Sequence, residues 1–242
     1  MGPLTPVVGV VCGLAVEART LRPWVERQEV MVAVTGARPG AAERACARLI
    51  RGGCTVLVSW GVAGGLDPAL DPGTLVVPDE VVDETGRSWP LDRRLVPPAA
   101  GRISARTAIA TGAERIRLLG VERMVLRGEE KAAYLARRGA VAMDMESHHV
   151  ARAADAGGCR AIAIRAIADP ARRDLPPLAA MALDEAGRPQ IPIVLLGLLR
   201  RPGQIGRLLA AWRDTRHALA ALDEAATTVI PAILRAVDAL PD

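Results

Sequence analysis

Short runs of aliphatic residues alternate with amphipathic stretches along most of this chain. The clearest runs, at residues 7–12, 29–35, 54–60, 140–145 and 160–168, have the length and the β-branched content of strands. Segments with helical spacing separate several of them. Strands connected through helices are typical of a mostly parallel sheet that is covered by helices. The sequence therefore predicts an α/β fold.

The remaining elements follow from the same patterns. Helices are expected at residues 17–25, 40–50, 129–138 and 147–156, and further strands at residues 74–82 and 106–111. Residues 97–104 are expected to form a loop, and the chain from residue 176 onward is helical. Neither an internal repeat nor a low-complexity linker divides the chain. We therefore expect one domain over residues 1–242, with a helical C-terminal part at residues 176–242.

The amino-acid composition limits how the core is built and which classes of function are compatible with the chain. Half of the 242 residues are hydrophobic, with no Phe, one Tyr and four Trp, so aliphatic side chains have to fill the core. The net charge is +4, but the arginines are scattered beside acids and no basic run alternates with stacking aromatics, which argues against a nucleic-acid groove. Cys12, Cys46, Cys54 and Cys159 show no CxxC spacing and are expected to be buried, reduced thiols.

The sequence shows no targeting or membrane-spanning pattern. The apolar stretch at residues 7–16 has no basic start and leads directly into Glu17, so it is interpreted as a buried strand rather than a signal peptide. No segment contains the ~18 uninterrupted apolar residues that a spanning helix needs. We expect a cytoplasmic protein, or one that is peripheral to the inner face of the membrane.

Three segments place glycines or acids at the ends of predicted strands, where open α/β sheets bind ligands. They are residues 13–17, residues 61–65, and the pair formed by residues 144–146 and 166–169. The glycines at 61–65 predict a turn whose backbone amides approach a ligand, although such glycines serve a tight turn more often than an anion cradle. The segment is not a dinucleotide fingerprint, because the GxGxxG spacing is absent.

Two carboxylates carry the clearest chemistry. Glu146 lies between a predicted strand and a predicted helix, and Asp169 ends a neighbouring predicted strand before Pro170. An ionised carboxylate accepts hydrogen bonds from vicinal hydroxyls, and a protonated one donates to a departing base. The same positions also suit a helix N-cap or first-turn acid for Glu146 and a turn-forming acid for Asp169. Spacing alone favours neither interpretation.

A family resemblance favours the functional interpretation. Residues 59–66 (SWGVAGGL) with 71–77 (DPGTLVV), residues 141–147 (VAMDMES) and residues 165–169 (RAIAD) resemble, in order, segments of the purine nucleoside phosphorylase and methylthioadenosine nucleosidase superfamily. The resemblance covers roughly residues 7–170. It implies a twisted mixed central sheet with helices on both faces, assembled at least as a dimer, and an enzyme that cleaves the bond between a purine base and its ribose.

The resemblance also implies roles for individual residues. Glu146 would bind the ribose hydroxyls, Met145 would pack against the sugar, and Asp169 would protonate the purine at N7. Glu17 falls at the position of the carboxylate that activates water in nucleosidases of the family. The glycine turn and acceptor site would comprise Gly13, Gly61, Val62 and Gly64, and the wall beside the base would comprise Met124, Val125 and Leu126.

The acceptor of the ribosyl group is water or phosphate. Phosphorylases of the superfamily hold phosphate with an Arg and a Ser around the glycine turn, where this chain has Ser59 and Val62, and Glu17 lies where another phosphate-binding Arg often lies. A fixed carboxylate repels phosphate, so these residues favour hydrolysis. Arg19 or Arg38 would be the alternative source of an anion site. No cofactor is expected, and phosphate would be a co-substrate.

The C-terminal part resembles a narrower group. Residues 170–177 (PARRDLPP), 187–196 (GRPQIPIVLL) and 198–204 (LLRRPGQ), together with residues 144–148 (DMESH), resemble the hopanoid-associated phosphorylases. This implies cleavage of adenosylhopane into adenine and ribosylhopane or its phosphorylated form. Residues 191–199 are apolar except for Pro192 and Gly197, which suits a channel for a hydrocarbon or a lipid surface, and also a core helix or a dimer interface.

Two other functions stay open. One is a nucleosidase for methylthioadenosine or adenosylhomocysteine, or a general purine nucleoside phosphorylase, and the other is a catalytically silent purine-binding protein. Expected partners are a small lipid-linked nucleoside, a second copy of the chain and the membrane surface. His148 and His149 suggest a metal site, but neighbours on a helix point apart and no third ligand is spaced to join them, so we expect no metal.

Overall fold

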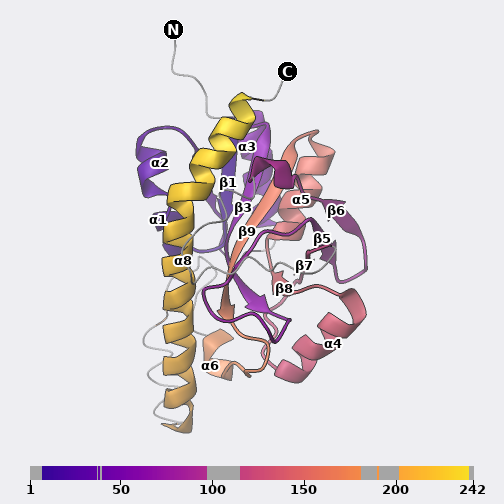
Figure 1. Cartoon of the computed structure of the whole chain (residues 1–242), viewed down its shortest axis with the longest axis vertical. Coiled ribbons are helices and arrows are strands. Elements are labelled where there is room, and N and C mark those ends of the chain that lie inside the picture. The colour runs from indigo at the N-terminus through magenta and orange to yellow at the C-terminus, as the bar shows by residue number, and fades with distance from the viewer. Residues whose placement is uncertain are drawn as a thin grey trace.

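The computed structural model describes residues 7–36, 38, 40–96, 115–180, 190 and 202–239. The loop expected at residues 97–104, the strand expected at residues 106–111 and the apolar stretch at residues 191–199 lie outside these residues. Within the described residues, one nine-stranded sheet has the order β2-β1-β3-β8-β7-β5-β6, while β9 pairs with β3 and β4 pairs with β9 (Figure 1).

The strands are β1 (Val8–Cys12), β2 (Met31–Val34), β3 (Val56–Gly65), β4 (Leu75–Val76), β5 (Glu80–Asp83), β6 (Ser88–Pro90), β7 (Arg117–Gly120), β8 (Ala142–Asp144) and β9 (Arg160–Asp169). The α-helices are α1 (Ala15–Arg19), α2 (Arg22–Glu26), α3 (Ala41–Arg51), α4 (Gly128–Arg138), α5 (Ser147–Ala156), α6 (Pro177–Ala180) and α8 (Ile205–Asp238), with short 3₁₀ turns at Arg93–Leu95 and Pro202–Gln204.

The sheet is mixed, as expected. The pairs β1–β2, β1–β3, β3–β9, β5–β7 and β7–β8 are parallel, whereas β3–β8, β4–β9 and β5–β6 are antiparallel. The register of the long β3–β9 pair places Gly61 opposite Arg165 and, after a shift of one residue, Gly64 opposite Asp169. A shift of this kind re-aims the side chains that follow it, and here it lies directly before Asp169.

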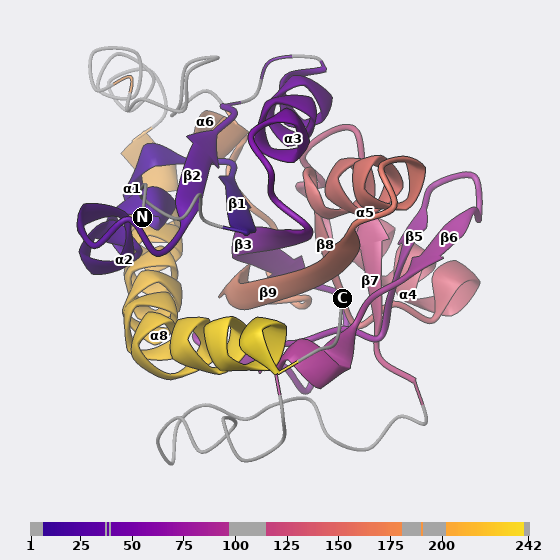
Figure 2. The same ribbon diagram turned by 90° about the horizontal axis from the view of Figure 1, so that it is seen from above.

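Aliphatic side chains fill both faces of the central strands. Val58 of β3 and Ile164 of β9 pack toward α8, whereas Leu57 packs toward α3 and α5. Figure 2 shows α8 on one side of the sheet and α3 and α5 on the other. Strands buried on both faces are near-continuous apolar runs, which is why the runs were recognisable in a sequence without Phe.

The 34-residue helix α8 covers one face of the sheet. From Ala218 onward it buries Ala218, Leu222, Ala225, Val229 and Ile233 at intervals of three or four residues, as expected for a helix with one apolar stripe. Within the described residues α8 is long and apolar enough to cross a membrane by length and composition, with 44% of the apolar window buried. Packing on the sheet accounts for the apolar stripe of this part of the helix.

Several expected elements differ from the structure, and proline explains two of the differences. The helix expected at residues 17–25 is divided into α1 and α2 before Pro23, and the strand expected at residues 74–82 is divided into β4 and β5 around Pro78. Proline lacks the backbone N–H that a continuing helix or strand would use. The sequence analysis also missed β6 and β7, which are only three and four residues long.

Candidate active site

A buried arginine organises the ends of β3, β8 and β9. The guanidinium of Arg165 is fully buried and forms ion pairs with Asp144 and, at 3.7 Å, with Glu146. It also donates hydrogen bonds to the hydroxyl oxygens of Ser59 at 2.5 Å and Ser147 at 3.1 Å. Its charge therefore compensates a group of acids that would repel one another in a dry site. This role was not predicted from the sequence, although an arginine within an apolar strand was a signal for it.

Glu17 joins α1 to β3. Its carboxylate is buried and accepts hydrogen bonds from the backbone N–H groups of Leu14 and Val62, each at 2.8 Å. Burial raises the pKa of Glu17, and Arg165 and the two backbone N–H groups oppose that increase. A buried carboxylate with a raised pKa is suited to accept a proton from a nucleophile such as water.

The glycines of the site make room for these charged groups. A Cβ at Gly61 would lie 2.5 Å from Arg165 Nη1 and 2.5 Å from Glu17 Oε1, and a Cβ at Gly13 would lie 2.7 Å from Glu146 Oε1. The expected glycine turn at residues 61–65 is wrong, because these residues continue strand β3 and Gly64 pairs with Met143 of β8. The amide of Val62 binds Glu17, so it is not free to form an anion cradle, which the sequence had favoured less than a tight turn.

The Glu146 carboxylate lies beside the buried guanidinium of Arg165. Glu146 occupies the N-cap position of α5, but its side chain makes no capping hydrogen bond. Asp144 caps the helix instead, because its carboxylate accepts the Ser147 backbone N–H at 2.9 Å and the Ser147 hydroxyl at 2.7 Å. The capping interpretation of Glu146 is therefore wrong. Burial raises the pKa of Glu146, and the neighbouring acids Asp144 and Glu17 add to that effect while Arg165 opposes it.

Asp169 ends β9 and has an asymmetric carboxyl group. One oxygen, Oδ2, lies 2.6 Å from Lys131 Nζ, while Oδ1 is buried without a hydrogen-bond partner in the described part of the chain. Burial raises the pKa of Asp169 to about 6, even though the positive charge of Lys131 lowers it. The side chain bonds to α4 rather than to the turn that follows, so the turn-forming interpretation is wrong. A carboxyl group that titrates near neutral pH suits a general acid.

Lys131 is the second residue that the sequence analysis missed. Its side chain is fully buried in α4, and its ammonium group donates to the backbone carbonyls of Pro170 at 3.1 Å and Arg173 at 3.0 Å as well as contacting Asp169. It therefore holds both the acid and the turn after it. A lysine on an amphipathic helix is ordinarily a surface residue, but this one is the only lysine in a chain that otherwise uses arginine.

The residues expected to form the wall beside the base lie in the connection between β7 and α4. Val125 is buried and belongs to a cluster with Met143, against which Met145 packs. The Leu126 carbonyl accepts the Leu175 backbone N–H at 2.8 Å, which places this connection beside the turn after Asp169. Met124 is 40% exposed. The structure thus brings Met145 and Val125 together, and their roles toward sugar and base stay predictions.

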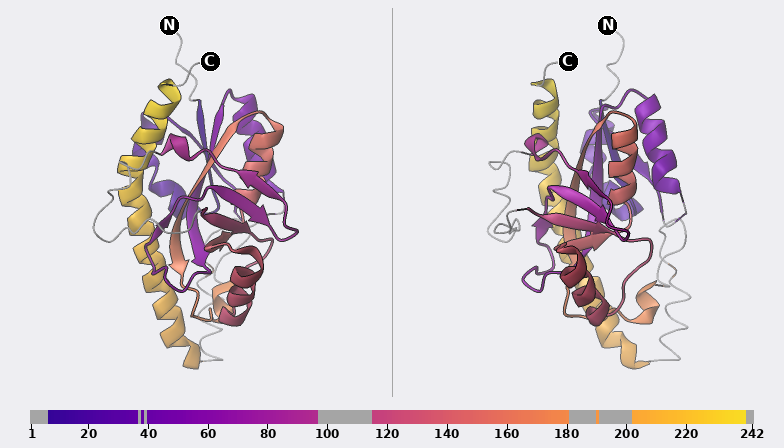
Figure 3. Two further views of the ribbon diagram at one scale, coloured as in Figure 1. Left: turned by 45° about the vertical axis from the view of Figure 1, so that its right-hand side comes forward. Right: turned by 90° about the vertical axis from the view of Figure 1, so that its right-hand side faces the viewer.

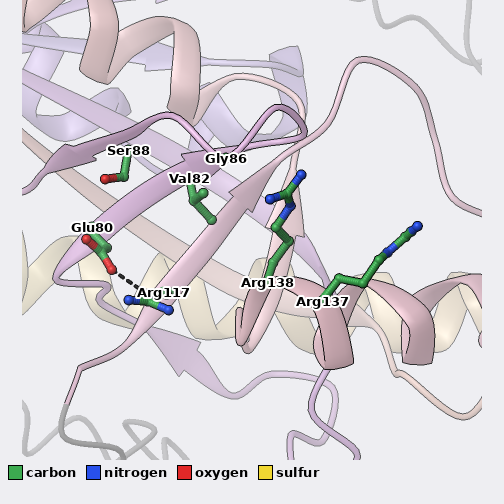
Figure 4. A pocket seen from close by; sticks show the side chains of 7 residues that line it. All are labelled: Glu80, Val82, Gly86, Ser88, Arg117, Arg137 and Arg138. Atoms are coloured by element: carbon green, nitrogen blue, oxygen red, sulfur yellow. Dashed lines mark hydrogen bonds and ion pairs between the residues drawn. The ribbon is translucent and has the colours of Figure 1, made fainter.

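A separate pocket lies between α4 and strands β5 to β7. Figure 4 shows its lining, which consists of Glu80, Val82, Gly86, Ser88, Arg117, Arg137 and Arg138. Arg117 pairs with Glu80, and Arg138 donates to the backbone carbonyl of Glu84. The pocket's volume of about 210 Å³ is below the ~300 Å³ typical of small-molecule sites. None of the candidate active-site residues lines it.

The two adjacent histidines are arranged differently from the expectation. The ring centroids of His148 and His149 lie 3.8 Å apart. The Glu122 carboxylate lies beside both rings, 3.1 Å from His148 Nε2 and 3.7 Å from His149 Nε2. Both reasons for expecting no metal are therefore wrong, because the rings do not point apart and a third side chain of ligand type joins them.

Comparisons with known proteins show which solved structures share the fold of this chain. No curated protein sequence matches it. The 5′-methylthioadenosine/S-adenosylhomocysteine nucleosidase from Neisseria meningitidis, solved with methylthio-immucillin-A, matches with a TM-score of 0.68 and 17% identity over 95% of this chain and 98% of that one. The futalosine hydrolase of Helicobacter pylori strain 26695 matches with a TM-score of 0.63 and 15% identity over 98% and 99%. At these identities the likeness concerns the fold.

The match to a protein family is independent of these structures. The model of the family described as the phosphorylase superfamily matches residues 11–188. This stretch contains Gly13, Glu17, Glu146 and Asp169, so it includes the cluster at the ends of β3, β8 and β9 as well as most of the sheet. The chain belongs to the phosphorylase superfamily.

Proposed function

We propose that this protein cleaves the N-glycosidic bond of a purine nucleoside. The observation that carries the proposal is Asp169, whose buried Oδ1 lacks a partner among the described residues and whose pKa is raised to about 6. The Asp169 carboxyl donates its proton to N7 of the base. The C1′–N bond then breaks with its electron pair passing to the base, which leaves neutral. Glu146 accepts hydrogen bonds from the ribose hydroxyls and stabilises the positive charge that develops on the sugar.

Water is the proposed acceptor. The oxygen of water attacks C1′ and its proton passes to Glu17. Phosphate would need unpaired donors and a net positive charge at this place. Arg165 Nη1 has no hydrogen-bond partner among the described residues, but it faces the same space as the Glu17 carboxylate, and the acids around Arg165 compensate its charge. The amides of Leu14 and Val62 are already bound by Glu17. The test is turnover with and without phosphate, with identification of the sugar product. Strict dependence on phosphate would contradict this proposal.

The proposed substrate is adenosylhopane, a nucleoside joined to a hydrocarbon skeleton. Its support is the resemblance of the C-terminal segments to the hopanoid-associated phosphorylases, together with an apolar surface on α8. Leu209 is 60% exposed and Trp212 is 59% exposed, and with Leu208 they line a groove of about 320 Å³. This end of α8 projects past the carboxyl ends of β3 and β9 (Figures 1 and 3).

The same surface supports peripheral attachment of a cytoplasmic protein to the inner face of the membrane. Arg207, Arg213 and Arg216 are exposed beside the apolar residues, and the Arg216 guanidinium lies 4.8 Å from the centre of the Trp212 ring. Apolar side chains flanked by arginine are suited to an interface of anionic lipid. We further propose a homodimer or a higher homo-oligomer, which light scattering would detect as at least twice the 25.5 kDa mass of one chain.

A second candidate function is a nucleosidase for methylthioadenosine or adenosylhomocysteine, and the likeness to the Neisseria meningitidis structure favours it. The decisive experiment incubates purified protein with adenosylhopane, methylthioadenosine, adenosylhomocysteine and adenosine, and measures adenine. We expect the highest kcat/KM with adenosylhopane. A higher value with methylthioadenosine would replace the proposed substrate with the second candidate. If none of the four released adenine, the third possibility, a silent purine-binding protein, would be favoured instead.

A further inference from the structure

We propose that Glu122, His148 and His149 form a binding site for a divalent cation of the Zn²⁺ class, outside the candidate active site. One ligand atom from each of the three residues lies within 4.8 Å of the other two. Two imidazoles and one carboxylate are a set that zinc binds in proteins, with a water molecule completing a four-coordinate site. The ligands come from two places in the chain, since Glu122 follows β7 and the histidines lie in the first turn of α5.

The distances between the ligand atoms fit a tetrahedral ion. Bonds of ~2.0–2.1 Å place two ligand atoms about 3.3 Å apart on a tetrahedral zinc. His148 Nε2 lies 3.1 Å from Glu122 Oε1, and His149 Nε2 lies 3.7 Å from Glu122 Oε2. The Glu122 side chain is 70% exposed, whereas the histidine rings are held in the structure. Metal binding would therefore use the freedom of the Glu122 side chain, whose two oxygens each approach one of the rings.

A second carboxylate orients one of the imidazoles. Glu43 Oε1 lies 2.7 Å from His149 Nδ1, and Arg152 donates to the same oxygen at 2.6 Å. A hydrogen at Nδ1 directed to Glu43 leaves the lone pair of a neutral ring on Nε2, the nitrogen that faces Glu122. Carboxylate–histidine pairs of this kind are the usual outer shell of histidine metal ligands. Figure 2 shows α3, which carries Glu43, beside α5.

Two carboxylates give this place the negative charge that a cation would balance. Glu122 Oε1 lies 3.1 Å from His148 Nε2, and the Glu84 carboxylate lies close as well, because it accepts the Glu122 backbone N–H at 3.1 Å. A divalent ion is attracted to both acids and to the lone pairs that neutral imidazole rings present.

The position of the site gives it a structural consequence. His148 directly follows Ser147, whose hydroxyl binds Arg165, and it lies two residues after Glu146. An ion shared by Glu122 and the histidines would join the connection after β7 to the first turn of α5. Bound metal is therefore expected to raise the midpoint of thermal unfolding, because a ligand that binds only the folded state stabilises it.

The test uses the full chain without a polyhistidine tag, stripped with a chelator and titrated with Co²⁺ and Zn²⁺. We expect one ion per chain, a visible Co²⁺ spectrum typical of a four-coordinate site, and a higher unfolding midpoint. His149→Gln and Glu122→Gln should each weaken binding at least about tenfold, and Glu43→Gln about tenfold through the outer shell. The matched control is His217→Gln, since His217 is the third histidine of the chain and is exposed on α8.

Three outcomes would overturn the proposal: no stoichiometric binding at micromolar Zn²⁺, equal binding by His149→Gln and the wild type, or the same loss in the His217→Gln control. Circular dichroism establishes that each variant is folded. Glu122→Gln serves where His149→Gln disturbs α5, because Glu122 lies at the surface. These readouts do not depend on turnover, so they are independent of the proposed enzymatic function.

Discussion

At the scale of single residues, Asp169 differs from the other acids of the cluster because the proposed mechanism has it protonate the leaving group. Asp169→Asn keeps the shape of the side chain and removes the acid. We expect kcat to fall by about 10²- to 10⁴-fold, as for loss of a general acid, while circular dichroism shows a native fold. Asp155→Asn, at the exposed end of α5, is the matched control. Near-normal turnover by Asp169→Asn would refute the assignment.

The raised pKa of Asp169 also has a consequence for stability. The folded protein holds this proton up to about pH 6, whereas the unfolded chain releases it near its ordinary pKa of about 3.9. Folding therefore binds a proton between these values, and this group's contribution to the free energy of unfolding falls as pH rises. Relative to Asp169→Asn, the wild type should lose about 2 kcal/mol between pH 4 and pH 7. Urea titrations of both proteins at several pH values would measure the difference, and a pH-independent difference would contradict it.

Glu146 and Asp169 could be located in the sequence because acids at the ends of apolar runs stand out, whereas Glu17 was assigned through the family resemblance. Arg165 and Lys131 could not be assigned in the same way. An arginine in a strand is compatible with many environments until the acids around it are known, and these acids come from segments far apart in the chain. Lys131 reaches Asp169 across 38 residues of sequence, a contact that arises only when the fold brings α4 to the end of β9 and the turn after it.

At the scale of elements, the close approach of β3 to Arg165 and Glu17 depends on a residue without a side chain, Gly61. Gly61→Ala would place a Cβ 2.5 Å from both Arg165 Nη1 and Glu17 Oε1. We expect the two charged groups to separate and kcat/KM to fall at least about tenfold. Gly206→Ala is the control, because a Cβ at this position of α8 meets nothing within 4 Å. Equal activity of the two variants would show that the close approach is dispensable.

Helix α8 is connected to the turn that follows β9. The buried Asp214 carboxylate pairs with Arg173, whose carbonyl accepts from Lys131 at 3.0 Å. Asp214→Asn should lower the free energy of unfolding by about 1–3 kcal/mol and reduce kcat, because the turn beside Asp169 loosens. Chemical denaturation and steady-state kinetics measure both effects. The exposed Asp223→Asn of the same helix should change neither.

The elements themselves were predictable to different degrees. The helix at 147–156 was predicted with the bounds that the structure gives. The structure shows that Asp144 caps its start and that Gly157 ends it. The glycines at 61–65 were wrongly assigned to a turn, because glycine has the same local signature in a turn and in a strand that packs against large side chains. Local sequence does not distinguish these two environments.

At the scale of the whole molecule, the proposed lipid surface predicts membrane binding. The double variant Leu209→Ser, Trp212→Ser removes the two most exposed large apolar side chains of α8. Binding to vesicles that contain anionic lipid should weaken at least about tenfold. The control is Val25→Ser on α2, where the side chain is 42% exposed. Sedimentation with vesicles measures the bound fraction, and equal binding by the double variant would contradict a lipid-facing α8.

The fold class followed from the alternation of apolar and amphipathic segments, but the order of strands did not. The antiparallel contact of β3 with β8 joins Gly64 to Met143, and the one-residue shift between β3 and β9 is set by packing. Neither the β3–β8 pairing nor the register shift leaves a recognisable pattern in the local sequence. These two pairings bring the ends of β3, β8 and β9 together, so the site became complete only in three dimensions.

The buried lysine of α4 gives the protein a chemical reporter. Apart from the amino terminus, Lys131 Nζ is the only primary amine in the chain, and it is fully enclosed while it contacts Asp169. An amine-reactive label can reach residue 131 only when the turn after β9 moves away. The rate of labelling at this one position therefore measures how often the acid is uncovered. A nucleoside that occupies the site should slow the labelling.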